Sequence, residues 1–347
     1  MLLAACCRWS FSTTPTSTGC FAARRSRRTR PSRLKDVSCA ASGKRGFALT
    51  VYLALSRTPH GLLDLAGPFC AALLCRGGLP PLPVVALGIV VVFAGYTAVY
   101  ALNDIVDYRS DKRQLEASGA DERVNYLDAA FIRHPLARGC LSLPGAIAWF
   151  LGWAVVAFIG AYALNPVCAV LLVLGCVLET AYCLLLTVTH LRALINGLVK
   201  ALGPLAAAYA VVPDPSPWFL AGLVAWVFAW EIGGQNIPAD WHDASRDAIT
   251  GARTMPVVLG YARASRLAVV LLAVSLILSV PLLALSPLGV SAPLVLAAGL
   301  GGAWLVLPPA LTLAATLEDA QAAALFNRAS AYPALVLAVL VVALLTG

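Results

Sequence analysis

The stretch "YALNDIVDYRSDK", residues 100–112, ends a long apolar run with an asparagine and three aspartates. If the helix of the apolar run continues through this stretch, Asp104, Asp107 and Asp111 fall at i, i+3 and i+7 on one helix face. Asn103 lies four residues before Asp107 and shares this stripe. The sequence therefore predicts a row of acidic side chains at one mouth of an apolar helix.

The chain as a whole has the composition of a polytopic membrane protein. Of its 347 residues, 60% are hydrophobic and 12% are charged, whereas about 25% are charged in an ordinary soluble domain. About nine segments are apolar and have, or nearly have, the roughly 20 residues that cross a bilayer as a helix. Their short connections predict one all-α bundle of about nine transmembrane helices. The segments lie near residues 58–75, 82–102, 143–163, 167–187, 193–212, 217–235, 266–285, 291–316 and 329–346.

Most of the positive charge lies in an N-terminal leader. Residues 1–46 hold ten Lys or Arg and one acidic residue, so residues 47–347, the expected membrane domain, carry −1 although the whole chain carries +8. That domain offers no basic surface for nucleic acid, and we expect no nucleic acid partner. The leader is basic and rich in Ser and Thr, and it resembles an organelle transit peptide. A disordered tail and an upstream start codon are the alternatives.

A second acidic stripe lies in "EIGGQNIPADWHDASRDAITGARTMPVVLG", residues 231–260. Its asparagine and three aspartates are spaced at i, i+4, i+7 and i+11, on one narrow helix face, provided that Pro238 does not break the helix. Both stripes follow an even-numbered apolar segment, so the bundle is expected to bring them to the same membrane face. The residues of the second stripe are Asn236, Asp240, Asp243 and Asp247.

The charge of the loops predicts which face this is. Lys and Arg gather in the connections after the second, fourth and sixth segments and are absent from the turns after the third, fifth and seventh. The positive-inside rule places the acidic loops, 103–142 and 236–265, on the cytoplasmic side, or on the matrix or stromal side of an organelle membrane. We expect a multi-pass protein of the cell inner membrane, or of an organelle membrane if the leader is a transit peptide.

Two facing carboxylate stripes repel each other unless cations lie between them. Hard oxygen ligands select Mg²⁺, which keeps several waters and is completed by phosphate oxygens of a substrate. The stripes and Mg²⁺ are thus suited to hold a diphosphate, and a pair of solvated polar loops is the alternative. The predicted catalytic residues are Asp104, Asp107, Asp111, Asp240, Asp243 and Asp247. The predicted metal ligands are Asn103, Asp107, Asp111, Asn236, Asp240, Asp243 and Asp247.

These stripes resemble the motifs of the UbiA-type intramembrane prenyltransferase superfamily. The first family motif, N-D-x2-D-x3-D, begins in this chain at Asn103. The second, D-x2-D-x3-D-x3-G-x2-T-x-P-V-x-L-G, runs from Asp240 to Gly260. "IRHPLARGCLS" (132–142) is similar to the stretch that follows the first motif, and "YLALSRTP" (52–59) to the entry into the first helix. The resemblance extends over most of the expected membrane domain.

The resemblance implies nine helices around a central cavity, with a polar cap formed by the two acidic loops. It also implies the reaction: two or more Mg²⁺ ions bridge the aspartates and an isoprenyl diphosphate, diphosphate leaves, and the allylic cation alkylates an acceptor. The physics agrees, because metal ions neutralise the charge that builds on leaving diphosphate. We expect a membrane-bound prenyltransferase with a lipophilic or aromatic acceptor, such as a hydroxybenzoate precursor of a quinone.

Basic and aromatic residues are further candidates for binding the substrate. Basic side chains near the stripes are suited to contact diphosphate oxygens, or else they are surface charges that set the topology. Those chosen are Arg109, Lys112, Arg138 and Arg253, in addition to the two asparagines, Asn103 and Asn236. An allylic cation needs π-faces and exclusion of water. The aromatic candidates are Tyr96, Tyr100, Tyr182, Trp226 and Trp230, with packing in the membrane as their alternative role.

Lys200 lies inside the fifth apolar segment, where an ionisable residue is a functional candidate. It is included in the predicted substrate site together with Tyr182. Glu179 and Glu231 are possible partners of its ammonium group, and a purely structural Lys–Glu pair is the alternative.

One departure from the family pattern concerns the fourth apolar segment. After the tyrosine at position 182, many family members carry a Lys–Arg pair that faces the diphosphate. This chain has Leu186 and Thr187 at the expected positions. Arg192 and Lys200 are candidates to replace the missing pair.

Two rival classes are a cation transporter and another membrane transferase. A transporter would carry ionisable residues near the middle of several spans and an inverted repeat, whereas most acids of this chain lie at one mouth. A relative that transfers a phosphorylated sugar to polyprenyl phosphate stays an alternative. The CDP-alcohol phosphotransferase pattern, D-x2-D-G-x2-A-R followed by G-x3-D-x3-D, is absent from the sequence. Intact acidic motifs argue against a non-catalytic scaffold.

Overall fold

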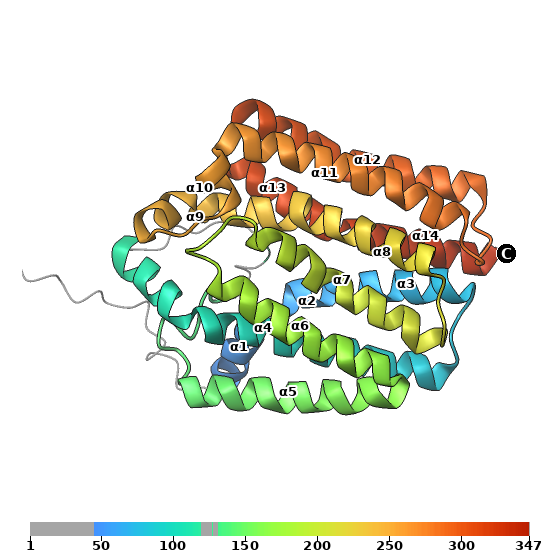
Figure 1. Cartoon of the computed structure of the whole chain (residues 1–347), viewed down its shortest axis with the longest axis horizontal. Helices are drawn as coiled ribbons and strands as arrows, with labels where there is room; N and C mark the ends of the chain where they lie inside the picture. Colours follow the sequence, from blue (N-terminus) through green and yellow to red (C-terminus); the bar gives the residue numbers. More distant parts are fainter. Residues whose placement is uncertain (1–44, 119–126, 128–130, 347) are drawn as a thin grey trace, which may run out of the picture. The chain divides into compact units, whose positions relative to one another are not determined.

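The computed structural model describes residues 45–118, 127 and 131–346. The predicted leader, residues 1–46, lies outside this part of the chain apart from its last two residues. The secondary structure of the described part is helical, and eight helical segments are long and apolar enough to cross a membrane (Figure 1). The predicted all-α membrane bundle is confirmed.

Short helices precede and separate the long ones along the chain. In chain order the helices are α1 (Arg45–Leu55), α2 (Thr58–Asp64), α3 (Ala66–Arg76), α4 (Leu82–Ser118), α5 (Leu143–Leu164), α6 (Pro166–Leu184), α7 (Arg192–Val211), α8 (Pro217–Trp230), the π-helix η3 (Glu231–Asn236), α9 (Ile237–Thr250), α10 (Met255–Leu259), α11 (Tyr261–Ala284), α12 (Ala292–Thr316), α13 (Asp319–Ser330) and α14 (Tyr332–Thr346).

Eight of the nine predicted spans correspond to the eight membrane-length helical segments of the described residues. The first predicted span, residues 58–75, is instead divided into α2 and α3, each too short to cross a bilayer alone. Two of the others continue far past their expected ends. Helix α4 runs on to Ser118, and α8 passes directly into η3 and α9, which ends at Thr250. Because the acidic stripes lie in these continuations, each stripe is carried by an extension of a membrane helix.

Local sequence explains where these helices begin and end. The Asn165 side chain accepts a hydrogen bond from the backbone N–H of Val167 and caps α6. Pro238 lies in the first turn of α9, where a proline is tolerated, so the break that it threatened in the second stripe does not occur. Gly251 ends α9 with φ of 79°, a conformation that glycine adopts without strain.

Small residues let the helices approach one another closely. A Cβ added at Gly160 of α5 would lie 2.5 Å from Val91 of α4. In η3, a Cβ at Gly234 would lie 2.7 Å from the Cβ of Ala329 on α13. The glycines of the π-helix therefore let it pack closely against its neighbours.

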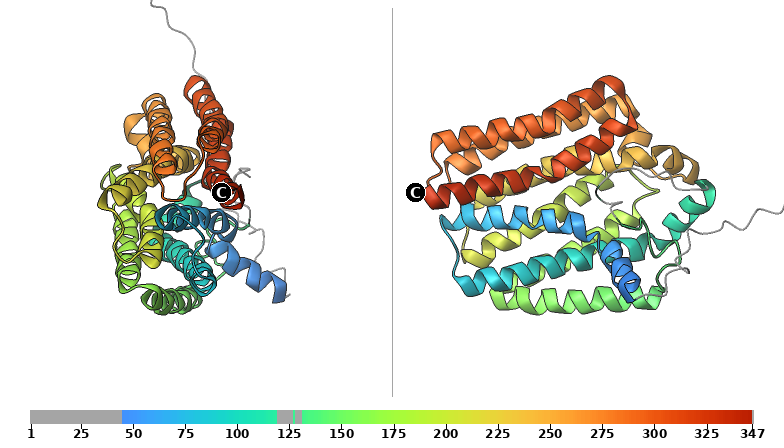
Figure 2. Two further views of the ribbon diagram at one scale, coloured as in Figure 1. Left: turned by 90° about the vertical axis from the view of Figure 1, so that its right-hand side faces the viewer. Right: turned by 180° about the vertical axis from the view of Figure 1, so that it is seen from behind.

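Both acidic stripes lie at the same end of the bundle (Figures 1 and 2). The end of α4 packs on α9 there, and α10 follows α9. The Gln114 side-chain amide on α4 donates a hydrogen bond of 2.7 Å to the Asp247 carboxylate on α9. The two stripes thus face each other across one end of the helical bundle.

Candidate active site

One cavity of about 600 Å³ joins the acidic stripes to the opposite end of the bundle. Residues of α2, α3, α4, α6, α7, η3, α9 and α14 line it. Along α4 the lining extends from Val84 to Gln114, a length of about 45 Å at the rise of an α-helix. The walls are acidic near Gln114 and apolar around Val84, Val85 and Leu344. This polarity suits a molecule with a charged head and a long apolar tail.

Among the described residues, Arg57 and His134 pair with carboxylates of the first stripe. The Arg57 guanidinium lies 3.4 Å from Asp104 and donates a hydrogen bond of 3.0 Å to the Asn103 side-chain oxygen. His134 Nδ1 lies 2.9 Å from the Asp111 carboxylate. The ligand atoms of Asp104, Asp111 and His134 all lie within 4.8 Å of one another. This triplet is close enough to share one cation.

The two residues that contact the first stripe have an unusual backbone. Among the described residues, the non-glycine positions with positive φ are Arg57 (44°), His134 (49°) and Leu317 (58°). Such conformations cost free energy and gather at functional sites. Burial lowers the pKa of His134, but the neighbouring Asp111 carboxylate outweighs burial and raises that pKa above its ordinary value. His134 therefore keeps its proton to a higher pH than a free histidine does.

The second stripe is contacted by three arginines. Arg192 lies 3.2 Å from Asp240. Arg133, from the segment between α4 and α5, pairs with both oxygens of Asp243, and Arg246 lies 3.0 Å from the same carboxylate. The third aspartate accepts the amide hydrogen bond from α4 described above. The second stripe is thus more fully neutralised than the first.

Arg192 is one of the two candidates to replace the missing Lys–Arg pair. It is buried, lines the cavity, and its guanidinium carbon lies 4.2 Å from the centre of the Tyr182 ring. The Asn236 amide donates a hydrogen bond of 3.1 Å to the Tyr182 hydroxyl, which links the second stripe to α6. Leu186 also lines the cavity and presents no charge there. Of the two candidate replacements, Arg192 is the one that contacts an acidic stripe directly.

The structure brings most of the predicted site residues to one cavity. Those that line it are Asn103, Asp104, Asp107, Asp111, Tyr182, Lys200, Asn236, Asp240, Asp243 and Asp247. Arg109, Lys112 and Arg253 are exposed and do not line it. Arg138 is half-buried outside the lining, and its Nε donates a 2.8 Å hydrogen bond to the backbone oxygen of Arg133. A contact between these four basic residues and a substrate stays a prediction.

Sequence reasoning did not single out several residues that reach the site. Arg57, Arg133 and His134 line the cavity, although each lies in a stretch that resembles the family, "YLALSRTP" or "IRHPLARGCLS". The two arginines and the histidine within these two stretches were therefore the sequence features that could have pointed to the site. Of the aromatic candidates, Tyr96, Tyr100 and Tyr182 line the cavity, whereas the two tryptophans are buried outside it.

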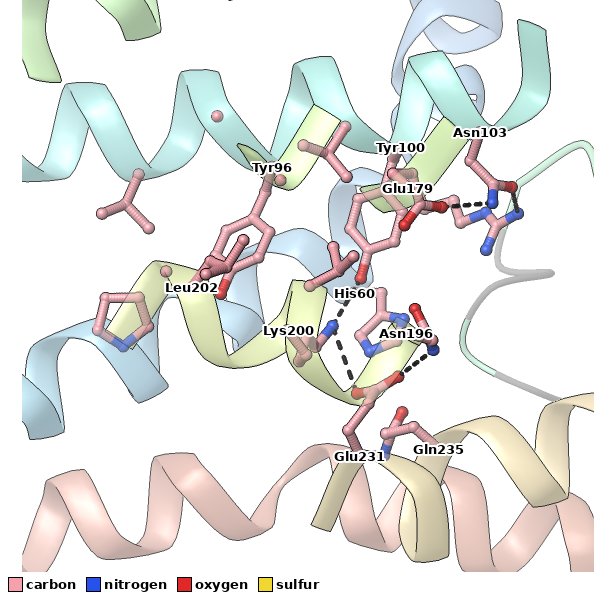
Figure 3. Close-up of a pocket in the computed structure, with 18 of the residues that line it drawn as sticks. His60, Tyr96, Tyr100, Asn103, Glu179, Asn196, Lys200, Leu202, Glu231 and Gln235 are labelled. Carbon is pink, nitrogen blue, oxygen red and sulfur yellow. Dashed lines mark hydrogen bonds and ion pairs between the residues drawn. The ribbon is translucent and has the colours of Figure 1, made fainter. Parts of the chain in front are cut away.

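Lys200 lies in a buried polar cluster deeper in the cavity (Figure 3). Its ammonium group donates a 2.7 Å hydrogen bond to Asp64 of α2 and lies 3.8 Å from Glu231 of η3. Glu231 is thus a partner, as expected, but the closest partner is Asp64, which sequence reasoning did not choose. Glu179, the other expected partner, instead accepts a 2.7 Å hydrogen bond from Asn103.

The residues present fit Mg²⁺. Mg²⁺ prefers carboxylate and amide oxygens, and all six predicted aspartates and both asparagines line the same end of one cavity. The Asn236 side-chain oxygen is buried without a hydrogen-bond partner although the amide nitrogen of the same side chain is engaged. A buried acceptor left in this state is costly, and a cation would satisfy it.

The model of the UbiA prenyltransferase family matches residues 65–331, most of the described helices. The chain belongs to this family and is a membrane prenyltransferase. The matched residues include both acidic stripes.

Several solved structures share the fold. The apo structure of a UbiA homolog from Aeropyrum pernix K1 is 21% identical, covers 82% of this chain and 97% of its own, and has a TM-score of 0.62. A UbiA homolog from Archaeoglobus fulgidus bound to DMAPP and Mg²⁺ is 18% identical, with coverages of 85% and 99% and a TM-score of 0.60. A digeranylgeranylglyceryl phosphate synthase is 17% identical, with coverages of 85% and 98% and a TM-score of 0.59. No curated protein matches the sequence.

Proposed function

We propose that the protein transfers an isoprenyl chain from an isoprenyl diphosphate to an aromatic quinone precursor such as a hydroxybenzoate, in a reaction that requires Mg²⁺. One observation carries this proposal: six carboxylates from two helices line the charged end of a cavity whose remaining length is largely apolar. The donor class is supported by solved relatives bound to DMAPP and Mg²⁺ and to GPP and Mg²⁺.

The metal would be held between the stripes. When bound, Mg²⁺ neutralises the charge that builds on the oxygens of the leaving diphosphate. The residues that would hold it are Asn103, Asp107 and Asp111 on α4, and Asn236, Asp240, Asp243 and Asp247 on η3 and α9. His134 is a further candidate, because it shares a possible cation site with two carboxylates of the first stripe.

Side chains of the charged end bind and orient the donor. Arg57, Arg133 and Arg192 line this end, and their guanidinium groups are suited to donate to diphosphate oxygens. As the bond between C1 and the diphosphate oxygen breaks, its electron pair leaves with diphosphate. The π-faces of Tyr100 and Tyr182 stabilise the allylic cation, and the apolar walls exclude water that would capture it. A new carbon–carbon bond to the acceptor ring then forms, and the ring loses a proton.

Purified protein in nanodiscs tests this function with radiolabelled GPP, Mg²⁺ and a panel of acceptors. The panel holds 4-hydroxybenzoate, a dihydroxynaphthoate and a prenylglyceryl phosphate, the last because one solved relative is a digeranylgeranylglyceryl phosphate synthase. The expected result is a prenylated aromatic product that disappears with EDTA. Folded protein that forms no product with any acceptor would count against the proposal. If the only product is a prenylated glyceryl ether, the aromatic acceptor in the proposal is wrong and a prenylglyceryl phosphate takes its place.

The orientation in the membrane is part of this proposal. The loops that carry the acidic stripes are proposed to face the cytoplasm, or the matrix or stroma of an organelle. A cysteine placed at exposed Arg253 and another at exposed Trp218 of α8, labelled in intact vesicles with an impermeant maleimide, should report opposite sides. Labelling of both from the same side would overturn the orientation.

A further inference from the structure

A buried polar cluster lies in the wall of the cavity, next to the first acidic stripe on the side of the apolar walls. We call it the mid-cavity cluster; it consists of Asp64, Tyr100, Asn196, Lys200 and Glu231, from α2, α4, α7 and η3. All but Asp64 line the cavity, and Figure 3 shows Tyr100, Asn196, Lys200 and Glu231 side by side, with His60 next to them. Measured along α4, Tyr100 lies about 4.5 Å below Asn103, where the first stripe begins, and about 10 Å below Asp107.

The hydrogen bonds of Lys200 leave one hydrogen available. Its ammonium group donates to Asp64 at 2.7 Å and to the Tyr100 hydroxyl at 3.0 Å. An ammonium group has three N–H donors. The remaining partner is a carboxylate oxygen of Glu231 at 3.8 Å, beyond the range of a hydrogen bond.

Glu231 has one oxygen satisfied and one unsatisfied. Its Oε1 accepts a 2.9 Å hydrogen bond from the Asn196 amide. Its Oε2 is buried without a hydrogen-bond partner, and the residue is only 5% exposed. Leaving a buried carboxylate oxygen unpaired is costly. On either side of the gap between these two groups there is thus one unused hydrogen-bonding atom: an N–H donor of Lys200 and the acceptor Oε2 of Glu231.

The chemistry of that gap selects a hydroxyl group. An oxygen about 2.8 Å from both atoms can accept from Lys200 and donate to Glu231, and a hydroxyl has both capacities. An ether or a ketone oxygen accepts only, so it would leave Glu231 unpaired. An anion is disfavoured as well while His60 is neutral, because Lys200 then faces two carboxylates, Asp64 and Glu231. His60, which lies 3.6 Å from Asp64, adds a positive charge only when it is protonated.

The helix that carries Glu231 supports a functional reading of the cluster. Glu231 begins η3, and π-helical turns within α-helices often mark functional sites. The glycines of η3 pack tightly against α11 and α13, and Gln235 is hydrogen-bonded to α13 as well. Glu231 lines the cavity. Glu231 thus lies in the cavity wall, and its buried Oε2 becomes accessible to a ligand atom after a small rotation of the carboxylate.

We infer that the gap between Lys200 and Glu231 is the subsite for an uncharged hydroxyl group of the prenyl acceptor, and that Glu231 is a positioning residue which selects hydroxylated acceptors. The inference rests on the proposed function. A donor whose diphosphate lies between the acidic stripes has its C1 atom next to that head group, on the side toward the cluster. An acceptor anchored by its hydroxyl in this subsite would therefore present its reacting atom from within the apolar part of the cavity.

A substrate comparison with the wild-type protein gives the first test. Each hydroxylated acceptor that yields product, such as 4-hydroxybenzoate, is paired with its own methyl ether, such as 4-methoxybenzoate. The free hydroxyl form is expected to react with kcat/KM roughly 10²-fold higher, the scale set by leaving buried polar groups unpaired. Equal use of the two forms would overturn the inference without any variant. No product with any acceptor would instead overturn the proposed function on which it rests.

Glu231→Gln gives the second test, because it places an amide donor where the subsite needs an acceptor. The KM for the hydroxylated acceptor should rise about tenfold or more, and the preference over the methyl ether should fall to within about threefold. Binding of the unreactive donor analogue geranyl S-thiolodiphosphate should stay within about twofold, which also shows that the variant is folded. Asp319→Asn, the same chemical change at an exposed carboxylate of α13, serves as the matched control.

A purely structural ion pair predicts a different pattern. Glu231→Gln would then lower thermal stability or kcat while leaving the acceptor KM and the preference for the hydroxyl unchanged. That pattern, with donor binding intact, would overturn the inference and leave the proposed function standing.

Discussion

The two acidic stripes carry the same residue types but are neutralised very differently. On α4, three aspartates meet one arginine at 3.4 Å and one histidine. On α9, the equivalent aspartates meet three arginines and an amide. Their supports differ as well, because α4 is a continuous α-helix whereas the second stripe follows a π-helix. A motif comparison alone would treat the two stripes as equivalent.

This difference predicts a division of labour between the stripes. Among the described residues, Arg57 and His134 pair with the first stripe, and Arg192 interacts electrostatically with its Asp107. Because fewer cations pair directly with this stripe than with the second, we expect metal to bind there first. At the second stripe a metal ion must compete with Arg192 and Arg133 for the carboxylates. The same carboxylates position these two guanidinium groups to bind an anionic substrate. The following predictions test this asymmetry in order of decreasing effect.

Removing one carboxylate from each stripe should give the largest losses. Asp107→Ala and Asp240→Ala are each expected to lower prenyl transfer by about 10²–10³-fold, the range for losing one preorganised group at a developing charge. The asymmetry predicts that only Asp107→Ala also raises strongly the Mg²⁺ concentration needed for half-maximal rate. Steady-state rates over a Mg²⁺ titration measure both effects. Equal shifts in the Mg²⁺ requirement would refute the division of labour, and wild-type turnover in both variants would refute the metal assignment itself.

Arg192 should be the most important cation of the second stripe. Arg192→Met is expected to lower kcat/KM for the donor by about 10²-fold, because a charge-assisted contact to diphosphate is lost. Arg192→Lys should recover only part of this, since an ammonium group lacks the planar fork of guanidinium. Arg266→Met, at an exposed position of α11, is the control. A donor kcat/KM unchanged in Arg192→Met would show that this guanidinium only balances Asp240.

Arg133 should have a smaller effect than Arg192. It reaches Asp243 from the segment between α4 and α5 and positions that carboxylate, and such supporting contacts typically contribute 10–100-fold. Arg133→Gln is expected to lower kcat/KM for the donor by about tenfold. Arg113→Gln, an exposed arginine near the end of α4, should change it less than twofold. Isothermal titration of a donor analogue then separates binding from turnover. Equal effects of Arg133→Gln and Arg113→Gln would contradict the role of Arg133 in positioning Asp243.

The helices beneath the stripes should differ in their tolerance of one added methyl group. Gly234→Ala in η3 places a Cβ 2.7 Å from that of Ala329, so we expect a loss of about 1–3 kcal/mol from overpacking. Gly95→Ala in α4 meets only Leu172, at 3.8 Å, and should be neutral or stabilising by up to about 1 kcal/mol. Thermal unfolding in detergent measures both. If Gly234→Ala were as stable as wild type, tight packing would not be what holds η3 in place.

The sequence predicted the faces of single helices well and the contacts between helices poorly. Asp104, Asp107 and Asp111 line one cavity because residues three and four apart share a helix face, whatever the partners are. The pairing of Lys200 with Asp64 depends instead on how α2 and α7 are registered against each other, and periodicity within one helix carries no such information. The same reason explains why His134 was not chosen, since it reaches Asp111 only through a left-handed turn.

The length of α4 has a consequence for how the enzyme meets its donor. From Leu82 to Leu102 the helix rises about 30 Å, the thickness of the hydrocarbon core, so the carboxylates begin where that core ends. A lipid-soluble donor already carries its head group at this level and its chain in the bilayer. The concentration that governs the rate is therefore the mole fraction of donor among the lipids of the membrane. Diluting the donor with inert lipid should slow the enzyme, whereas adding buffer should not.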